Sequence, residues 1–191
     1  MARERGTADR SGEIGESMNE LVIADPGKCI GCRTCEVACV LAHANGDALS
    51  KLAAAHFIPR LKVVKTTRVS TPVQCRQCED APCAKVCPTG CLVQSHKSVQ
   101  VIQSRCIGCK SCVMACPYGA MEVVTHEPAV LERRVAKGPQ VEAYKCDLCV
   151  HRTQGPACIE VCPTKAISTI DAQVLEKRIS KRREQAALAA L

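Results

Sequence analysis

The chain has 191 residues and a formal net charge of +7; it contains 17 cysteines, no tryptophan, and only Phe57, Tyr118 and Tyr144 as aromatic residues. A chain of this length ordinarily fills its interior with aromatic side chains, so we expect a group bound to the cysteines to form part of the core. The scarcity of aromatics argues against a nucleic-acid partner bound by base stacking, despite the basic charge.

The cysteines also bear on the compartment. Their number is odd, and the chain is longer than the secreted domains that disulfides usually stabilise. The opening residues lack the apolar segment of a secretory signal, and the apolar runs are too short to span a bilayer. We therefore expect a cytoplasmic protein with reduced, metal-binding thiols, whose contact with the inner face of the membrane is at most peripheral, through a partner complex.

The predicted elements are short, and they begin after a polar stretch. Residues 1–17 lack periodicity, and we expect them to form a disordered extension. Alternation of apolar and polar residues predicts strands over 21–24, 60–65, 98–102, 121–125 and 166–170. Short helices are expected after the third cysteine of each cysteine group, including an apolar helical stretch over 37–44. Asp171 can cap a last helix over 171–191, which we expect to pack back on the domain with a solvated basic face; docking to a partner is the alternative.

Sixteen of the cysteines fall into four groups of four. They are group I, Cys29, Cys32, Cys35 and Cys39; group II, Cys75, Cys78, Cys83 and Cys87; group III, Cys106, Cys109, Cys112 and Cys116; and group IV, Cys146, Cys149, Cys158 and Cys162. Cys91 is left over.

The spacing within these groups indicates iron–sulfur chemistry. Groups I and III follow C-x2-C-x2-C-x3-C, the bacterial ferredoxin pattern, in which the fourth cysteine ligates the other cluster of a pair. Gly31 and Gly108 allow the tight turn that three closely spaced ligands need. Zinc is the main alternative, but zinc sites use separated pairs of C-x2-C. The pattern therefore favours [4Fe–4S] clusters.

The groups are arranged as a duplication. The segment from Lys28 to Cys39 matches that from Arg105 to Cys116, and the segment beginning at Cys83 matches that beginning at Cys158. We therefore predict an α+β, ferredoxin-like fold of two pseudo-symmetric two-cluster modules over 18–170. The central module covers about 66–125, the outer module 18–65 with 140–170, and the C-terminal helix follows.

With these groups in place, residues 18–170 resemble the four-cluster ferredoxin-like subunits of molybdenum oxidoreductases and hydrogenase systems, in particular the HydN and CooF types. The segments from Cys29 to Cys39, Val73 to Cys83 and Cys112 to Glu122 carry the resemblance. It implies that groups II and III exchange fourth cysteines, and that groups I and IV do the same. The implied ligand sets are cluster 1, Cys29, Cys32, Cys35 and Cys162; cluster 2, Cys146, Cys149, Cys158 and Cys39; cluster 3, Cys75, Cys78, Cys83 and Cys116; and cluster 4, Cys106, Cys109, Cys112 and Cys87.

The resemblance also implies a function. A non-catalytic electron carrier would take electrons from carbon monoxide dehydrogenase or a formate dehydrogenase and pass them to a hydrogenase. A subunit of a molybdenum oxidoreductase or formate hydrogenlyase system is an alternative, and an assembly protein docking through its C-terminal helix is another. A catalytic role would need an open iron or a nucleotide site, and the glycines form no G-x-G-x-x-G fingerprint. Four clusters of about −2 each would also nearly balance the net charge.

Several residues near the groups need an interpretation. Cys91 suits an apolar niche, with a replacement ligand or a redox-active thiol as alternatives. Lys28, Arg105 and Lys145 directly precede the first cysteine of groups I, III and IV, and Gln74 holds that place in group II. They are either surface charges or cations that raise a cluster potential.

Overall fold

In the computed structural model, the described residues are 18–44, 52, 57–95, 97–126 and 140–189. The extension predicted to be disordered, residues 1–17, lies outside them. Within these residues the strands form four two-stranded antiparallel sheets. They are β1 (Leu21–Ala24) with β8 (Ile167–Ile170), β2 (Leu61–Lys65) with β3 (Ser70–Gln74), β4 (Leu92–Ser95) with β5 (Ser98–Val101), and β6 (Glu122–His126) with β7 (Gln140–Tyr144).

The helices are short, and their positions follow the cysteine groups. They are α1 (Thr34–Ala42), α3 (Pro82–Lys85), α4 (Ser111–Ala115), α5 (Ala157–Glu160) and the final α6 (Ala172–Leu188), with a 3₁₀ turn η2 (Gln103–Arg105). Each of the first four begins one residue before the third cysteine of its group. Helix α1 is the longest of these four because Val40 follows its fourth cysteine, whereas Pro88, Pro117 and Pro163 stand at that place in the other groups and cannot continue a helix.

The five predicted strands are present, with ends shifted by a residue at most. The structure adds three more strands, β3, β4 and β7, which complete the pairs. Pro72 lies inside β3, and a proline inside a short alternating run argues against a strand. Here it pairs with Val63 in an isolated hairpin, where the missing N–H can face away from the partner strand.

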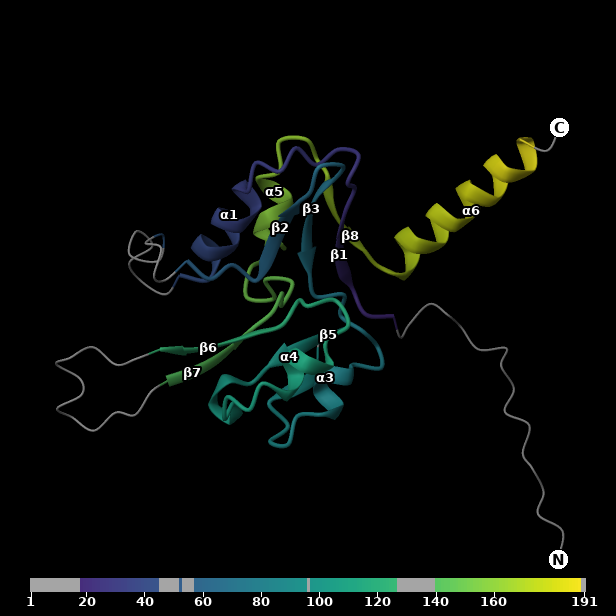
Figure 1. The fold of residues 1–191 in the computed structure, drawn as a ribbon. Helices are drawn as coiled ribbons and strands as arrows, with labels where there is room; N and C mark the ends of the chain where they lie inside the picture. The colour runs from purple at the N-terminus through teal and green to yellow at the C-terminus, as the bar shows by residue number, and fades with distance from the viewer. Residues whose placement is uncertain (1–17, 45–51, 53–56, 96, 127–139, 190–191) are drawn as a thin grey trace, which may run out of the picture.

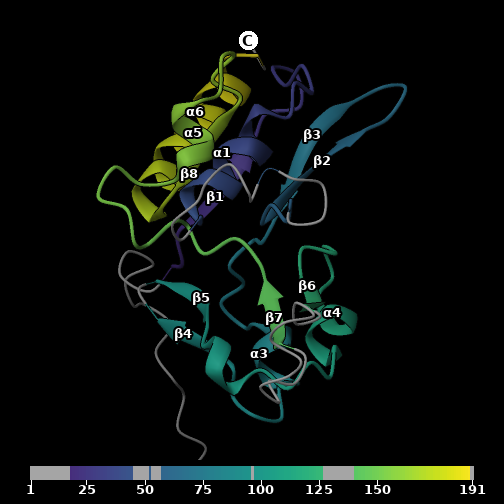
Figure 2. The ribbon, with the colours of Figure 1, turned by 90° about the vertical axis from the view of Figure 1, so that its left-hand side faces the viewer.

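The arrangement has an internal two-fold pattern. One hairpin, β4–β5, joins group II to group III, and β8 returns from group IV to pair with β1 ahead of group I. Figures 1 and 2 show the result as two bodies, one holding α1, α5, β1, β2, β3 and β8, the other holding α3, α4, β4, β5, β6 and β7.

Each body has its own buried core. One core is built around Val22, Leu61, Val63, Leu148 and Ile167, together with Cys35, Cys39 and Cys158. The other is built around Ala81, Leu92, Val99, Met121 and Ala143, together with Cys112. Cysteine thus contributes to both interiors, as expected from the scarcity of aromatic residues.

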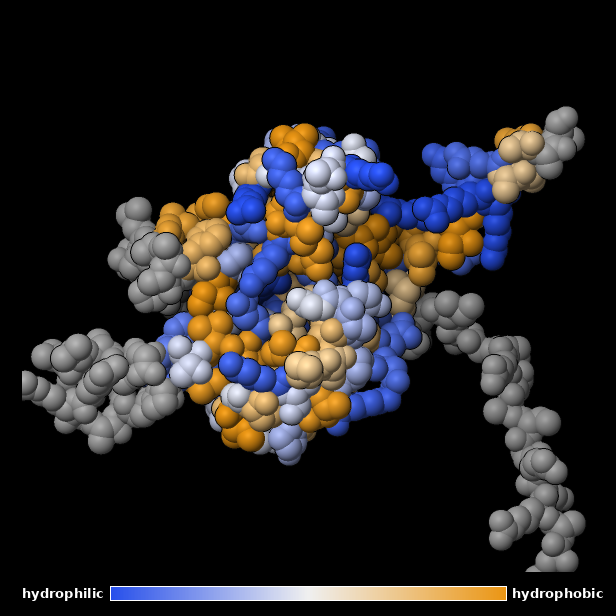
Figure 3. Space-filling view, in the orientation of Figure 1, coloured by the Kyte–Doolittle hydropathy of each residue, from blue (hydrophilic) through white to orange (hydrophobic). Residues whose placement is uncertain are grey.

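The C-terminal helix α6 stands out from the body in Figures 1 and 3. The Asp171 carboxylate accepts a hydrogen bond from the backbone N–H of Val174 at 2.7 Å, so the predicted cap is confirmed. None of its described residues is buried, although Leu175 and Ile179 line a groove with Met18 and Leu21. The predicted packing back on the domain is therefore limited to its first turns. No helix in the described residues has both the length and the apolar character needed to cross a membrane.

Candidate iron–sulfur cluster sites

The loop before the second cysteine of each group has the same backbone turn. The residue at this place has a positive φ in all four groups: Gly31 (68°), Gln77 (48°), Gly108 (72°) and Leu148 (60°). This left-handed conformation bends the chain so that the first two thiols face the same side. At Gly108 a side chain would collide, since a Cβ there would lie 2.7 Å from Cγ1 of Val141. Gln77 and Leu148 adopt this conformation with buried side chains. The Gln77 amide donates to the Cys146 carbonyl and accepts from the Val99 N–H, and Leu148 packs in the core with Val22.

The folded chain gathers the cysteines across groups. One small cavity is lined by the first three cysteines of group I together with Cys162 of group IV. A second is lined by the first three of group III together with Cys87 of group II, and Cys91 lies in the same wall. We call these site 1 (Cys29, Cys32, Cys35, Cys162) and site 4 (Cys87, Cys106, Cys109, Cys112).

The remaining eight cysteines form two further sets. Burial, together with the nearby Cys146 and Cys149 sulfurs, raises the pKa of the Cys39 thiol to about 12. Burial likewise raises the pKa of the Cys83 thiol to about 11, with Cys75 and Cys116 as neighbours acting in the same direction. We call these site 2 (Cys39, Cys146, Cys149, Cys158) and site 3 (Cys75, Cys78, Cys83, Cys116).

The fourth cysteine of every group accepts a backbone hydrogen bond at sulfur. In the three groups with a following proline the donor lies four residues on: Cys91 to Cys87 at 3.3 Å, Ala120 to Cys116 at 3.4 Å, and Ala166 to Cys162 at 3.3 Å. Cys39 lies inside α1, whose own turns use the local N–H groups, and its donor at 3.3 Å is Arg60 from a distant segment. The sulfur of the fourth cysteine thus accepts an N–H from a nearby residue in three groups and from a distant segment in group I.

Hydroxyl groups supply further contacts at the exposed sulfurs. A hydrogen bond from Thr34 lowers the pKa of Cys32, and one from Ser111 lowers that of Cys109. Hydrogen bonds to ligand sulfurs, together with solvent exposure, are among the factors that set the potential of an iron–sulfur cluster. The donor sets therefore fit [4Fe–4S] clusters: thiols converge on shared cavities, with backbone N–H and hydroxyl donors aimed at sulfur.

The four sites differ in exposure. Cys32 in site 1 and Cys109 in site 4 are exposed, and the isoleucines beside them, Ile30 and Ile107, are 61% and 63% exposed. Sites 2 and 3 lie next to each other, since the side chain of Gln77, which stands between Cys75 and Cys78 of site 3, donates to the carbonyl of Cys146 of site 2 at 2.7 Å. Sites 1 and 4 thus reach the surface, and sites 2 and 3 lie between them.

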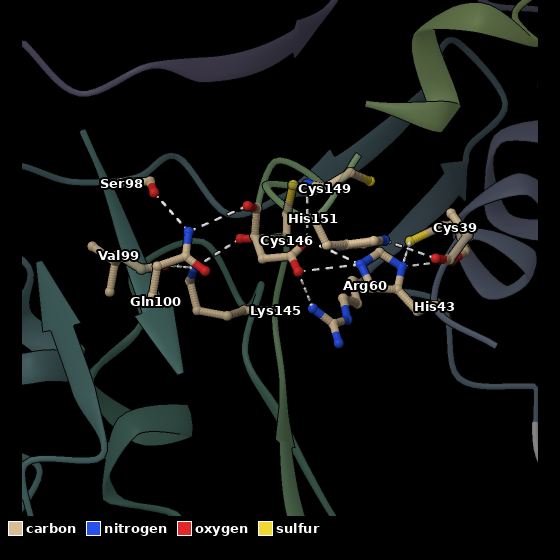
Figure 4. A network of polar contacts seen from close by, with 12 residues as sticks. Cys39, His43, Arg60, Ser98, Val99, Gln100, Lys145, Cys146, Cys149 and His151 are labelled. Carbon is tan, nitrogen blue, oxygen red and sulfur yellow. Dashed lines mark hydrogen bonds and ion pairs between the residues drawn. The ribbon is translucent and has the colours of Figure 1, made fainter. Parts of the chain in front are cut away.

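A polar network surrounds the Cys39 end of site 2 (Figure 4). His43 bonds to the Asp147 carboxylate through Nε2 at 3.0 Å and to the Cys39 carbonyl through Nδ1 at 2.7 Å. Arg60 donates to the same carboxylate, and His151 bonds to the Ala42 carbonyl at 2.8 Å, so neither histidine replaces a cysteine. Sequence reasoning missed Gln77 and Asp147; the only signal was that Gln77 stands where groups I and III have glycine.

The four residues at the place before the first cysteine lie in two environments. Lys28 and Arg105 are exposed, whereas Lys145 and Gln74 are each 1% exposed. A shared motif position therefore holds surface charges in groups I and III and interior side chains in groups II and IV.

Two family models for iron–sulfur binding match parts of the chain. Residues 66–172 match the family model "4Fe-4S dicluster domain", and residues 26–39 match "4Fe-4S binding domain". A chain of the BamBC complex of benzoyl coenzyme A reductase aligns over 79% of this chain and 76% of its own, with a TM-score of 0.37 and 20% identity.

Two curated relatives cover most of the chain. Electron transport protein HydN of Escherichia coli K12 is 49% identical over 90% of this chain and 99% of its own length. An iron–sulfur protein of Rhodospirillum rubrum is 44% identical over 80% of this chain and 83% of its own. The predicted α+β ferredoxin-like class is confirmed, and the relatives' names agree with a non-catalytic electron carrier. The chain therefore belongs to the 4Fe–4S dicluster family of HydN-like iron–sulfur electron transport proteins.

Proposed function

We propose that the protein binds four [4Fe–4S] clusters, one at each of sites 1 to 4, and conducts single electrons through them. The observation that supports this most directly is the spatial exchange of fourth cysteines, which gives every site four thiols. When bound, each cluster supplies a centre that accepts and releases one electron. The chain's own residues hold the clusters, shield the interior ones from water and donate hydrogen bonds to their sulfurs.

The order of the sites suits conduction. Because sites 1 and 4 reach the surface and sites 2 and 3 lie between them, an electron can enter at one end and leave at the other. With four cysteines at every site, no iron is left for a substrate. The chemistry of the donor and acceptor reactions then belongs to partner proteins.

The ligand exchange can be tested by serine substitution. In the reconstituted protein, Cys116→Ser and Cys78→Ser should alter the same electron paramagnetic resonance signal, while Cys116→Ser and Cys106→Ser should alter different ones. A purely local arrangement predicts the reverse, since Cys116 and Cys106 belong to one group. Cys91→Ala serves as the control and should alter no signal.

For the partners, we propose carbon monoxide dehydrogenase or a formate dehydrogenase as donor and a hydrogenase as acceptor. This rests on the resemblance to the HydN and CooF types. The test is anaerobic reduction of the reconstituted protein by each purified dehydrogenase with its substrate, followed by hydrogenase-dependent reoxidation with release of hydrogen. If neither dehydrogenase bleaches the visible iron–sulfur absorbance, the donor assignment is wrong.

A further inference from the structure

Lys145 is a lysine enclosed by the protein. Its side chain is 1% exposed and is among the largest fully buried side chains. The ammonium donates to the carbonyl oxygens of Val99 and Cys146, the latter at 2.7 Å (Figure 4). It also lies 3.3 Å from Oε1 of Gln77. Among the described residues, no carboxylate lies within ion-pair distance of it.

Such a charge needs a counter-charge. Burying an ion away from water is unfavourable, and neutral acceptors solvate the ammonium without cancelling its charge. The ammonium bonds to the carbonyl of Cys146, a ligand of site 2, and to the side chain of Gln77. The backbone N–H of Gln77 in turn donates to the sulfur of Cys75, a ligand of site 3, at 3.4 Å. Lys145 is therefore held beside ligands of both interior sites.

The duplication shows that this place does not require a cation. Gln74 holds the matching position before group II, is equally buried, and donates through Nε2 to the Val22 carbonyl at 2.8 Å. Val22 and Val99 themselves match, because each stands seven residues before the first cysteine of group I or III. In one half, a neutral amide therefore occupies the buried place that the ammonium holds in the other, and each bonds to the matching valine carbonyl.

We propose that Lys145 is a positioning residue for electron transfer, a fixed cation shared by sites 2 and 3 that raises the reduction potential of both interior clusters. The proposal rests on the proposed function. Reduction of a cluster takes one electron from the donor and changes its charge from about −2 to about −3. The added negative charge is stabilised by the nearby cation in a region that screens poorly. An electron that enters at site 1 or site 4 is then more stable on the clusters of sites 2 and 3.

The test uses the full chain with its clusters reconstituted, and the Lys145→Gln variant. Anaerobic redox titration followed by electron paramagnetic resonance should show the signals of sites 2 and 3 shifted to more negative potential, with those of sites 1 and 4 in place. Cys78→Ser and Cys106→Ser identify the signals of sites 3 and 4, and Cys149→Ser and Cys32→Ser identify those of sites 2 and 1. Lys28→Gln and Arg105→Gln are matched controls at the same motif position, and because their charges are exposed and screened, they should cause smaller shifts.

If Lys145→Gln fails to fold, the proposal can be tested with the reverse substitution at the matching position, Gln74→Lys. Gln74→Lys adds a second buried cation at the matching place and should shift the same two signals to more positive potential. Unchanged interior potentials in a variant with full iron content would overturn the proposal and would mean that Lys145 serves packing alone. Absence of four separate clusters in the unmodified protein would instead contradict the proposed function, so the two failures are distinguishable.

Discussion

Gly108→Ala tests the loop geometry on which the sites depend. Gly108 has a φ of +72°, and an added Cβ would lie 2.7 Å from Cγ1 and 3.2 Å from Cγ2 of Val141 in β7. The left-handed conformation costs a non-glycine residue about 1 kcal/mol, and the overlap with Val141 adds about 2 kcal/mol, as overpacking does elsewhere. For a chain of this size, about 3 kcal/mol should lower the apparent unfolding temperature by roughly 6–12 °C.

Gly119 provides the matched control for this substitution. It also has a positive φ, +59°, but nothing lies within 4 Å of an added Cβ. Gly119→Ala should therefore show the conformational cost alone, about 1 kcal/mol. The assay is anaerobic thermal unfolding of the reconstituted proteins at one scan rate, followed by circular dichroism and by the visible cluster absorbance.

The contact with Val141 can be isolated by a double substitution. Val141→Ala removes the methyl groups that the new Cβ would meet, so it should restore most of the overlap cost in the Gly108→Ala background. Equal losses for Gly108→Ala and Gly119→Ala, or no recovery with Val141→Ala, would refute the reasoning. In that case the loop would be able to move away from β7 without consequence for the site.

Two further predictions concern residues beside the ligands. Cys91→Ala should retain full iron content and cost no more than about 1 kcal/mol in the free energy of unfolding, because Ala120 and Ala166 hold the matching positions and the backbone N–H to Cys87 is kept; loss of a cluster on iron analysis would instead make Cys91 a ligand. Asp147→Asn should cost about 2 kcal/mol at neutral pH, measured by anaerobic denaturant unfolding. Burial opposes ionisation of this carboxyl, but hydrogen bonding from His43 and the charge of Arg60 hold its pKa well below the usual range. Its contribution is therefore present at neutral pH, and the difference from the unmodified protein should shrink as the pH falls below about 4; a difference that grows on acidification would contradict this account.

Local features of the chain were predictable because their causes are local. Cysteine spacing, glycine at Gly31 and Gly108, and the prolines after three fourth cysteines all act within a few residues. The strands β3, β4 and β7 were missed because each is defined by its partner more than by its own composition, and Pro72 in β3 argued against a strand. In the folded protein, pairing of β3 with β2 outweighs the local preference of Pro72 against a strand.

The sequence by itself determined the chemistry, since sixteen cysteines at ferredoxin spacing indicate iron–sulfur clusters wherever the chain places them. Tertiary structure decided which cysteines meet, because Cys39 and Cys146 are far apart along the chain and come together only in the folded protein, where α1 packs against α5. It also decided that Lys28 and Lys145, identical in motif position, have opposite environments. The reason is physical: spacing sets which ligands a loop can offer, whereas burial and the charge of a neighbour depend on how the two halves pack against each other.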